Sequence, residues 1–205
     1  MMRVTVLLPL LMLGGCITLL PDPPPPPRVF TLDAGDVARS ESPRLDAALG
    51  IANPDGERAI LGADLIWRTG QEIAYVGQTQ WSGRADDLLQ SLLIETIARQ
   101  GRFTGVTRSG EARNDFDIRW EVLDFEIDSQ TMQARFRADV RLMASPGRRL
   151  IAQEIISAEA PVSDRSASVA AQALARAARE GGARIGVFAS DAVAAELARR
   201  AASAD

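Results

Sequence analysis

Three consecutive segments in the second half of the chain have the pattern of long β-strands, and they constrain the fold more than any other feature. Residues 116–127 alternate apolar and polar side chains, but the alternation shifts phase once, near Val122 and Leu123. A shift of this kind predicts a β-bulge, because one extra residue turns every later side chain to the other face. Residues 134–143 and 150–160 follow as two further strands. Together the segments predict an antiparallel meander with one charged face and one buried face.

Residues 84–100 carry the clearest helical pattern. Apolar side chains recur there at helical spacing and form one stripe. Ser82 is a suitable residue to cap the start of this helix, and Gly101 is a suitable residue to end it. The stripe predicts that the helix lies across a sheet.

The last long segment, residues 166–199, is rich in alanine and helical in pattern, with Gly181-Gly182 near its centre. Each glycine costs about 1 kcal/mol in a helix interior, so the segment forms either two helices or one helix with a weak centre. Shorter strands are expected earlier, at residues 29–33, 45–51, 64–68 and 72–76. The order of elements predicts an α+β fold: a mainly antiparallel sheet with a long meander, and helices packed on one face. The core is expected to hold three tryptophans: Trp67, Trp81 and Trp120.

The composition excludes most catalytic chemistry. The chain has no histidine, no lysine and one cysteine, so the usual general bases, amine nucleophiles and soft metal ligands are missing. The net charge of −4 also argues against nucleic acid as a partner. Helix-start charge and the outer face of a strand explain four acidic residues: Asp86, Asp87, Asp124 and Glu126. We therefore expect no enzyme and no metal site.

The cysteine lies in an N-terminal pattern that is typical of export. Arg3 precedes an apolar run over residues 4–13, and the run ends in Leu-Gly-Gly-Cys at residues 13–16. The apolar run is half the ~20 residues that a bilayer-spanning helix needs. This pattern resembles a lipobox, which implies cleavage between Gly15 and Cys16 and a covalent lipid on the Cys16 sulfur. An ordinary secretory signal or a buried structural thiol are the alternatives.

Three parts are expected along the chain. Residues 1–15 are a lipoprotein signal peptide, residues 16–28 a proline-rich tether and residues 29–200 one folded domain. The run Pro23–Pro27 favours an extended polyproline helix, which acts as a stiff spacer. A polyproline ligand for a partner domain is the alternative. Ile17 follows the cysteine where an aspartate would retain the protein at the inner membrane, so the outer membrane is favoured.

Several features, taken in their order, resemble the ABC-type transport auxiliary lipoprotein family. The resemblance implies a non-catalytic, lipid-anchored periplasmic accessory subunit of an MCE-type transport system that moves phospholipid or another hydrophobic solute. It also implies partners: an MCE-domain protein with its ABC permease and ATPase, the membrane, and further copies of the chain. A structural or assembly lipoprotein of the outer membrane is the alternative. The features are the lipobox at Cys16, the segment Val29-Phe30-Thr31-Leu32, the segment Ile66-Trp67-Arg68, Trp81 ahead of Leu88 and Leu89, and the meander followed by the alanine-rich helix.

A row of arginines on the second meander strand is the candidate partner-binding surface. Arg135, Arg137 and Arg141 share one face of that strand. Guanidinium groups pair well with carboxylates and phosphates, so the row suits an acidic partner or lipid head groups. The alternative is a solvated sheet face whose charge is balanced by Asp117, Glu121 and Asp139.

Overall fold

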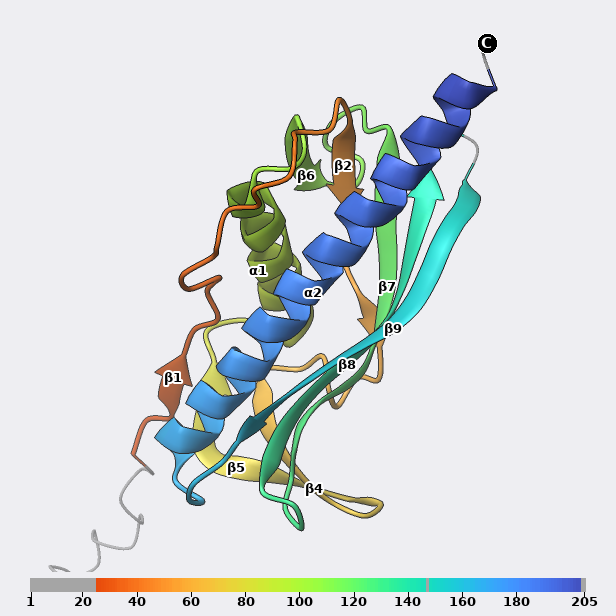
Figure 1. The fold of residues 1–205 in the computed structure, drawn as a ribbon. Coiled ribbons are helices and arrows are strands. Elements are labelled where there is room, and N and C mark those ends of the chain that lie inside the picture. Colours follow the sequence, from red (N-terminus) through yellow and green to blue (C-terminus); the bar gives the residue numbers. More distant parts are fainter. Residues whose placement is uncertain (1–24, 147, 204–205) are drawn as a thin grey trace, which may run out of the picture.

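The computed structural model describes residues 25–146 and 148–203, and these form one α+β unit (Figure 1). Within these residues the strands are β1 (Arg28–Phe30), β2 (Ala48–Ile51), β3 (Asp55–Gly56), β4 (Asp64–Thr69), β5 (Glu72–Trp81), β6 (Gly105–Arg108), β7 (Phe116–Asp128), β8 (Gln133–Ala144) and β9 (Arg149–Pro161). The helices are α1 (Ala85–Gln100) and α2 (Ala167–Ala202). Both helices pack on one face of a mixed, mostly antiparallel sheet, which confirms the predicted fold class. None of the described helices is both long and apolar enough to span a bilayer.

Strand β7 organises the sheet. It is 13 residues long and pairs with β8 along nearly its whole length, in antiparallel fashion. Its other edge holds three short strands one after another, all parallel to it: β2, then β3, then β4. Strand β8 then pairs with β9, which completes the predicted meander. The parallel pairings were not part of the sequence prediction.

The predicted bulge lies where the phase of the alternation shifts. Val122 pairs with Ala138 and Asp124 pairs with Arg137, so Leu123 is the extra residue. Before the bulge, even-numbered side chains such as Val122 are buried; after it, Phe125 and Ile127 are buried instead. The bulge therefore keeps the apolar side chains on the helix face along the whole strand.

The strands before α1 differ in length from the prediction. Strands β1 and β2 are shorter than expected, whereas β5 continues to Trp81. That residue is 3% exposed and stacks on Phe125, with 5.7 Å between the ring centroids. Trp120 is also buried, and Trp67 is partly buried with Arg165 over its ring.

Helix α1 begins two residues later than a Ser82 cap would place it. Arg84 occupies the cap position, no side chain caps the helix, and the Ser82 backbone N–H instead donates to the Phe30 carbonyl at 2.6 Å. The Ser82 prediction is wrong because Ser82, directly after the end of β5, is hydrogen-bonded to β1 instead. Gly101 ends the helix in a left-handed conformation, φ 74°, as predicted.

Helix α2 is one continuous helix of 36 residues, so the two-helix alternative is excluded. Its glycines lie at close contacts. A Cβ on Gly181 would overlap the ring of Phe136 in β8, and a Cβ on Gly186 would overlap the Gln100 side chain of α1. Phe136 is 1% exposed, so the ring has no room to move away. The glycines therefore allow α2 to approach both the sheet and α1, at the expense of helix propensity.

The far end of α2 is tied to β9 through one buried carboxylate. Glu196 is 3% exposed, and its oxygens accept hydrogen bonds from Arg199 at 2.7 Å, from Arg200 at 2.8 Å and from Arg149 at 2.5 Å. The hydrogen bonds from Arg199, Arg200 and Arg149 lower the pKa of Glu196 to about 2. Because Arg149 is the first residue of β9, this cluster joins the end of the helix to the edge of the sheet.

Gly181→Ala should destabilise the fold, although alanine is the better helix former. The methyl group would overlap the buried Phe136 ring, and overpacking of this kind costs about 1–3 kcal/mol. Urea unfolding measures the change in the free energy of unfolding. The matched control is Gly77→Ala, where an added Cβ meets nothing within 4 Å. Equal effects at the two positions would show that Gly181 is not needed for packing.

Glu196→Gln should lower the thermal unfolding midpoint at neutral pH, because the three arginines lose their shared charge. The pKa of the folded carboxyl lies near 2 against an ordinary 4.5. The stabilisation is therefore fully present above about pH 4.5 and is lost as the pH falls toward 2. Calorimetric scans between pH 2 and pH 7 should show the midpoints converging at low pH. The control Glu180→Gln, at an exposed carboxylate of the same helix, should have little effect at any pH.

Candidate functional site: a groove along helix α2

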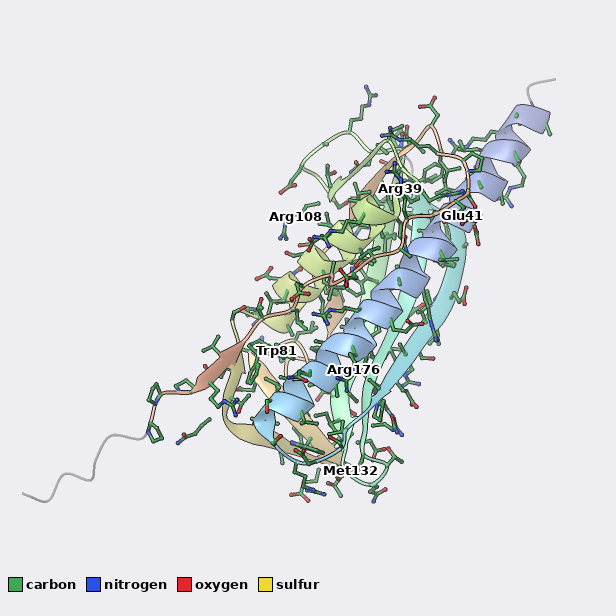
Figure 2. All side chains as sticks on the ribbon, turned by 60° about the vertical axis from the view of Figure 1, so that its left-hand side comes forward. Arg39, Glu41, Trp81, Arg108, Met132 and Arg176 are labelled. Carbon is green, nitrogen blue, oxygen red and sulfur yellow. The ribbon has the colours of Figure 1, made fainter. Side chains whose placement is uncertain are left out.

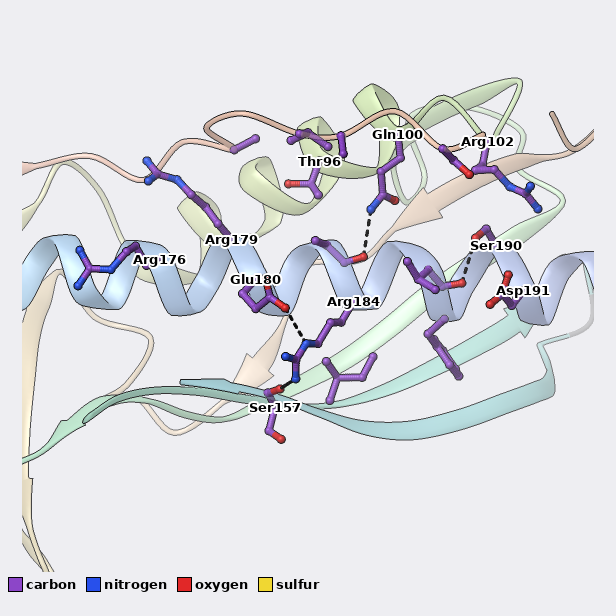
Figure 3. Close-up of a pocket in the computed structure, with 18 of the residues that line it drawn as sticks. Thr96, Gln100, Arg102, Ser157, Arg176, Arg179, Glu180, Arg184, Ser190 and Asp191 are labelled. Atoms are coloured by element: carbon purple, nitrogen blue, oxygen red, sulfur yellow. Dashed lines mark hydrogen bonds and ion pairs between the residues drawn. The ribbon is translucent and has the colours of Figure 1, made fainter. Parts of the chain in front are cut away.

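A groove of about 1440 Å³ runs along the exposed side of α2 (Figure 3). The loop of residues 34–40 and the end of α1 form one bank, and β9 forms the other. Helix α2 lies between them and contributes side chains to both. The groove exists because β9 pairs only with β8 among the described strands, so its second edge faces the helix.

Arginines of α2 satisfy part of that open strand edge. Arg184 donates from Nη1 to the Ser157 carbonyl of β9 at 2.7 Å and from Nε to Glu180 at 2.9 Å. Nearer the start of α2, Arg176 donates from Nη2 to the Pro161 carbonyl of β9 at 3.0 Å. Unpaired strand edges invite other strands, and charged side chains on them are a known defence. These contacts fix the β9 bank of the groove.

The opposite bank is held by side chains from both helices. Gln100 donates from Nε2 to the Ala183 carbonyl of α2 at 3.0 Å (Figure 3). Arg179 of α2 binds Asp33 through both its carbonyl and its carboxylate, at 3.0 and 2.6 Å. Arg99 of α1 donates to the Gly35 carbonyl at 2.7 Å. The loop is therefore fastened to α1 and α2 at its start.

Apolar side chains are exposed along the groove. Val187 on α2 and Ile155 on β9 are 55% and 59% exposed, although both are large aliphatic residues. Phe188 is partly buried against the core and also lines the groove. Arginines, carboxylates and aliphatic groups alternate over this surface, which makes the groove amphiphilic.

Arg102 is the unusual residue of the groove. It is 7% exposed, and its Nε and Nη1 have no hydrogen-bond partner among the described residues. Its carbonyl accepts from the Leu45 N–H at 2.7 Å, which fixes the backbone there. No pattern in the sequence selects Arg102, because it is a single arginine after the C-cap Gly101 and belongs to no periodic pattern. Only its burial without a partner distinguishes it.

The predicted arginine row lies elsewhere. Arg135, Arg137 and Arg141 alternate along β8 with buried residues such as Phe136, so they lie on the sheet face away from α2. Of the three carboxylates expected to balance them, only Asp139 does so; the others come from different positions. The ion pairs are Arg135 Nη1 to Asp128 at 2.8 Å, Arg135 Nε to Glu159 at 3.3 Å, Arg137 Nε to Asp124 at 2.5 Å, and Arg141 to Asp139.

Arginines also pair with Asp128 and with two of the acidic residues named from the sequence, Glu126 and Asp86. Hydrogen bonds from the Thr131 and Gln130 backbone, together with Arg135, lower the pKa of Asp128. Glu126 was expected on the outer face of its strand, but it is 3% exposed because Arg68 binds and covers it. Asp86 pairs with Arg84 at 2.7 Å. No group of three or more metal-ligating side chains occurs among the described residues.

The predicted lipidation and cleavage residues, Cys16 and Gly15, lie outside the described residues. The described chain enters the fold at β1, which follows directly on the proline run.

Residues 30–186 match the family model described as "ABC-type transport auxiliary lipoprotein component". The match spans the sheet, α1 and the first half of α2, so it includes most of the groove. The chain therefore belongs to this family, and its class is that of an accessory component of ABC-type transport. No curated protein sequence matches the chain.

Solved structures share the fold. Protein XCC0632 from Xanthomonas campestris is 19% identical, with a TM-score of 0.74, over 82% of this chain and 98% of that one. An uncharacterized protein is 13% identical, with a TM-score of 0.63, over 80% of this chain and 98% of its own. At these identities the likeness extends to the fold alone.

Proposed function

We propose that this protein is a non-catalytic, lipid-anchored accessory subunit of an MCE-type ABC transport system that moves phospholipid or another hydrophobic solute across the envelope. The family match over residues 30–186 carries the proposal, because it covers the domain that the chain folds into. An MCE-domain protein with its permease and ATPase is the proposed partner. Several copies of the chain would assemble around it.

The anchor rests on the sequence around Cys16. Two or more acyl chains hold a protein stably at a bilayer, and a lipidated N-terminal cysteine supplies them. The proline run between Cys16 and Arg28 would then separate the folded domain from the lipid surface. Ile17 favours the periplasmic face of the outer membrane as the location.

A non-catalytic role agrees with how the charged residues are used. The chain lacks histidine and lysine. The most buried carboxylates, Glu126 and Glu196, are each bound by arginine. For Glu196, whose pKa the arginines lower to about 2, this makes the carboxyl a poor general acid at neutral pH.

Recovery of partners from native membranes tests the function. The lipidated protein, crosslinked and purified, should bring down an MCE-domain protein together with a permease and an ATPase, as identified by mass spectrometry. Cys16→Ser is the control, because an unanchored chain should recover far less of the complex. Recovery of outer-membrane assembly factors alone would favour the structural alternative and contradict the transport role.

The arginine row remains the proposed contact surface for the MCE-domain partner. The described helices leave this sheet face uncovered, and its alternating charges suit a partner with a complementary pattern. Reversal of charge at Arg135 and Arg137 to glutamate should reduce partner recovery about tenfold or more. Arg113→Glu, on an exposed residue of the loop between β6 and β7, is the control. Unchanged recovery in the double variant would exclude this surface.

A further inference from the structure

The buried guanidinium of Arg102 has nitrogens without a hydrogen-bond acceptor, whereas the buried carboxylate Glu196 is paired with arginines. A buried donor without an acceptor is costly, and a charged one is more so. Elsewhere the chain neutralises its buried charges, as it does when Arg149, Arg199 and Arg200 share Glu196. At Arg102 no described carboxylate takes this role.

A second arginine lies beside Arg102. The Arg39 guanidinium lies over Gly101, with its Nε 3.3 Å from the position of a Cβ there, and Gly101 precedes Arg102 directly. Figure 2 shows Arg39 at the end of α1 that is opposite to Trp81. Arg39 is exposed and, within the described residues, is joined to no carboxylate by an ion pair. Both arginines line the groove, so two unneutralised guanidinium groups lie at one end of it.

An apolar surface continues from these two arginines along the groove. Val37 and Ala38 on the loop, and Ala183 and Val187 on α2, line it. Val187 is more than half exposed, so a ligand can cover it without unfolding any element. A site with cationic groups at one end and an aliphatic surface beside them suits a molecule with an anionic head and an apolar body.

We propose that this end of the groove binds the phosphate head group of an anionic amphiphile, with Arg102 and Arg39 as its charge partners. A phosphate presents several oxygens and can take donors from two guanidinium forks at once, which a single carboxylate does less well. The aliphatic bank of the groove would take the apolar body. The site deepens the proposed function, because it gives the accessory subunit a place for a transported lipid.

Asp191 is the competing partner within the protein. It lines the same groove as Arg102, yet no ion pair joins the two among the described residues. If Arg102 serves only to bind Asp191, the removal of either side chain should destabilise the protein, with or without ligand. If Arg102 serves a ligand, Asp191→Asn should leave ligand binding intact.

The test is ligand-dependent stabilisation of the full-length lipidated protein in dodecyl maltoside, followed by the fluorescence of the buried tryptophans. The probes are phosphatidylglycerol with six-carbon acyl chains, inorganic phosphate, and octyl glucoside as an amphiphile without charge. Phosphatidylglycerol should raise the unfolding midpoint by several degrees, because a ligand that binds only the folded state stabilises it. Octyl glucoside should not. An equal rise with inorganic phosphate would assign the site to free phosphate and overturn the amphiphile.

Arg102→Gln should weaken phosphatidylglycerol binding about tenfold to a hundredfold, as expected for the loss of charged hydrogen bonds, and should not lower the midpoint without ligand. Arg39→Gln, at an exposed position, should weaken binding as well. Arg119→Gln makes the same change of net charge away from the groove and should bind normally. No rise with the wild type, or equal binding by the Arg102 and Arg119 variants, would overturn the proposal. Because no transporter is present, failure here would leave the partner recovery experiment unaffected.

Discussion

The contact of Gly181 with the Phe136 ring sets how close α2 comes to the sheet. With any side chain at this position the helix would have to move outward, and the contacts that depend on its distance would lengthen together. They include the hydrogen bonds from Arg184 and Arg176 to β9 and the one from Gln100 to α2. The groove is the space left between elements that this one contact holds in place.

The short distance between α2 and the sheet also explains how the unpaired edge of β9 is protected. Strand β9 has one paired edge, and the donors that α2 offers along the other come from arginine side chains long enough to reach it. In a chain without lysine, arginine provides every basic side chain: it binds strand carbonyls, neutralises Glu126 and Glu196, and forms the row on β8. Arg102 differs from these arginines, because it is buried and its Nε and Nη1 have no acceptor among the described residues.

Local patterns predicted the local features, and long-range contacts account for what they missed. The phase shift at Val122 and Leu123 located the bulge, because side-chain alternation is a direct record of which face is buried. The pairing of β2, β3 and β4 with β7 cannot be predicted from the sequence in this way, because each of these strands is too short to show an alternating pattern. Helix propensity is a local quantity, and it marks Gly181 only as a weak point of the helix. The role of Gly181 depends on a distant residue, Phe136 in β8. The arginine row was found by alternation, but Arg102 could be recognised only from its burial.

The arrangement of short strands along β7 bears on how the chain folds. Strands β2, β3 and β4 all precede β7 by long intervals of sequence, and α2 follows every strand. Non-local pairing of this kind slows folding, because loop-closure entropy is lost before the contacts form. Until α2, the last element of the chain, has docked, the apolar face of β7, β8 and β9 has no cover. Before its last helix docks the chain therefore exposes an aggregation-prone sheet, and this is the interval in which a chaperone would be needed.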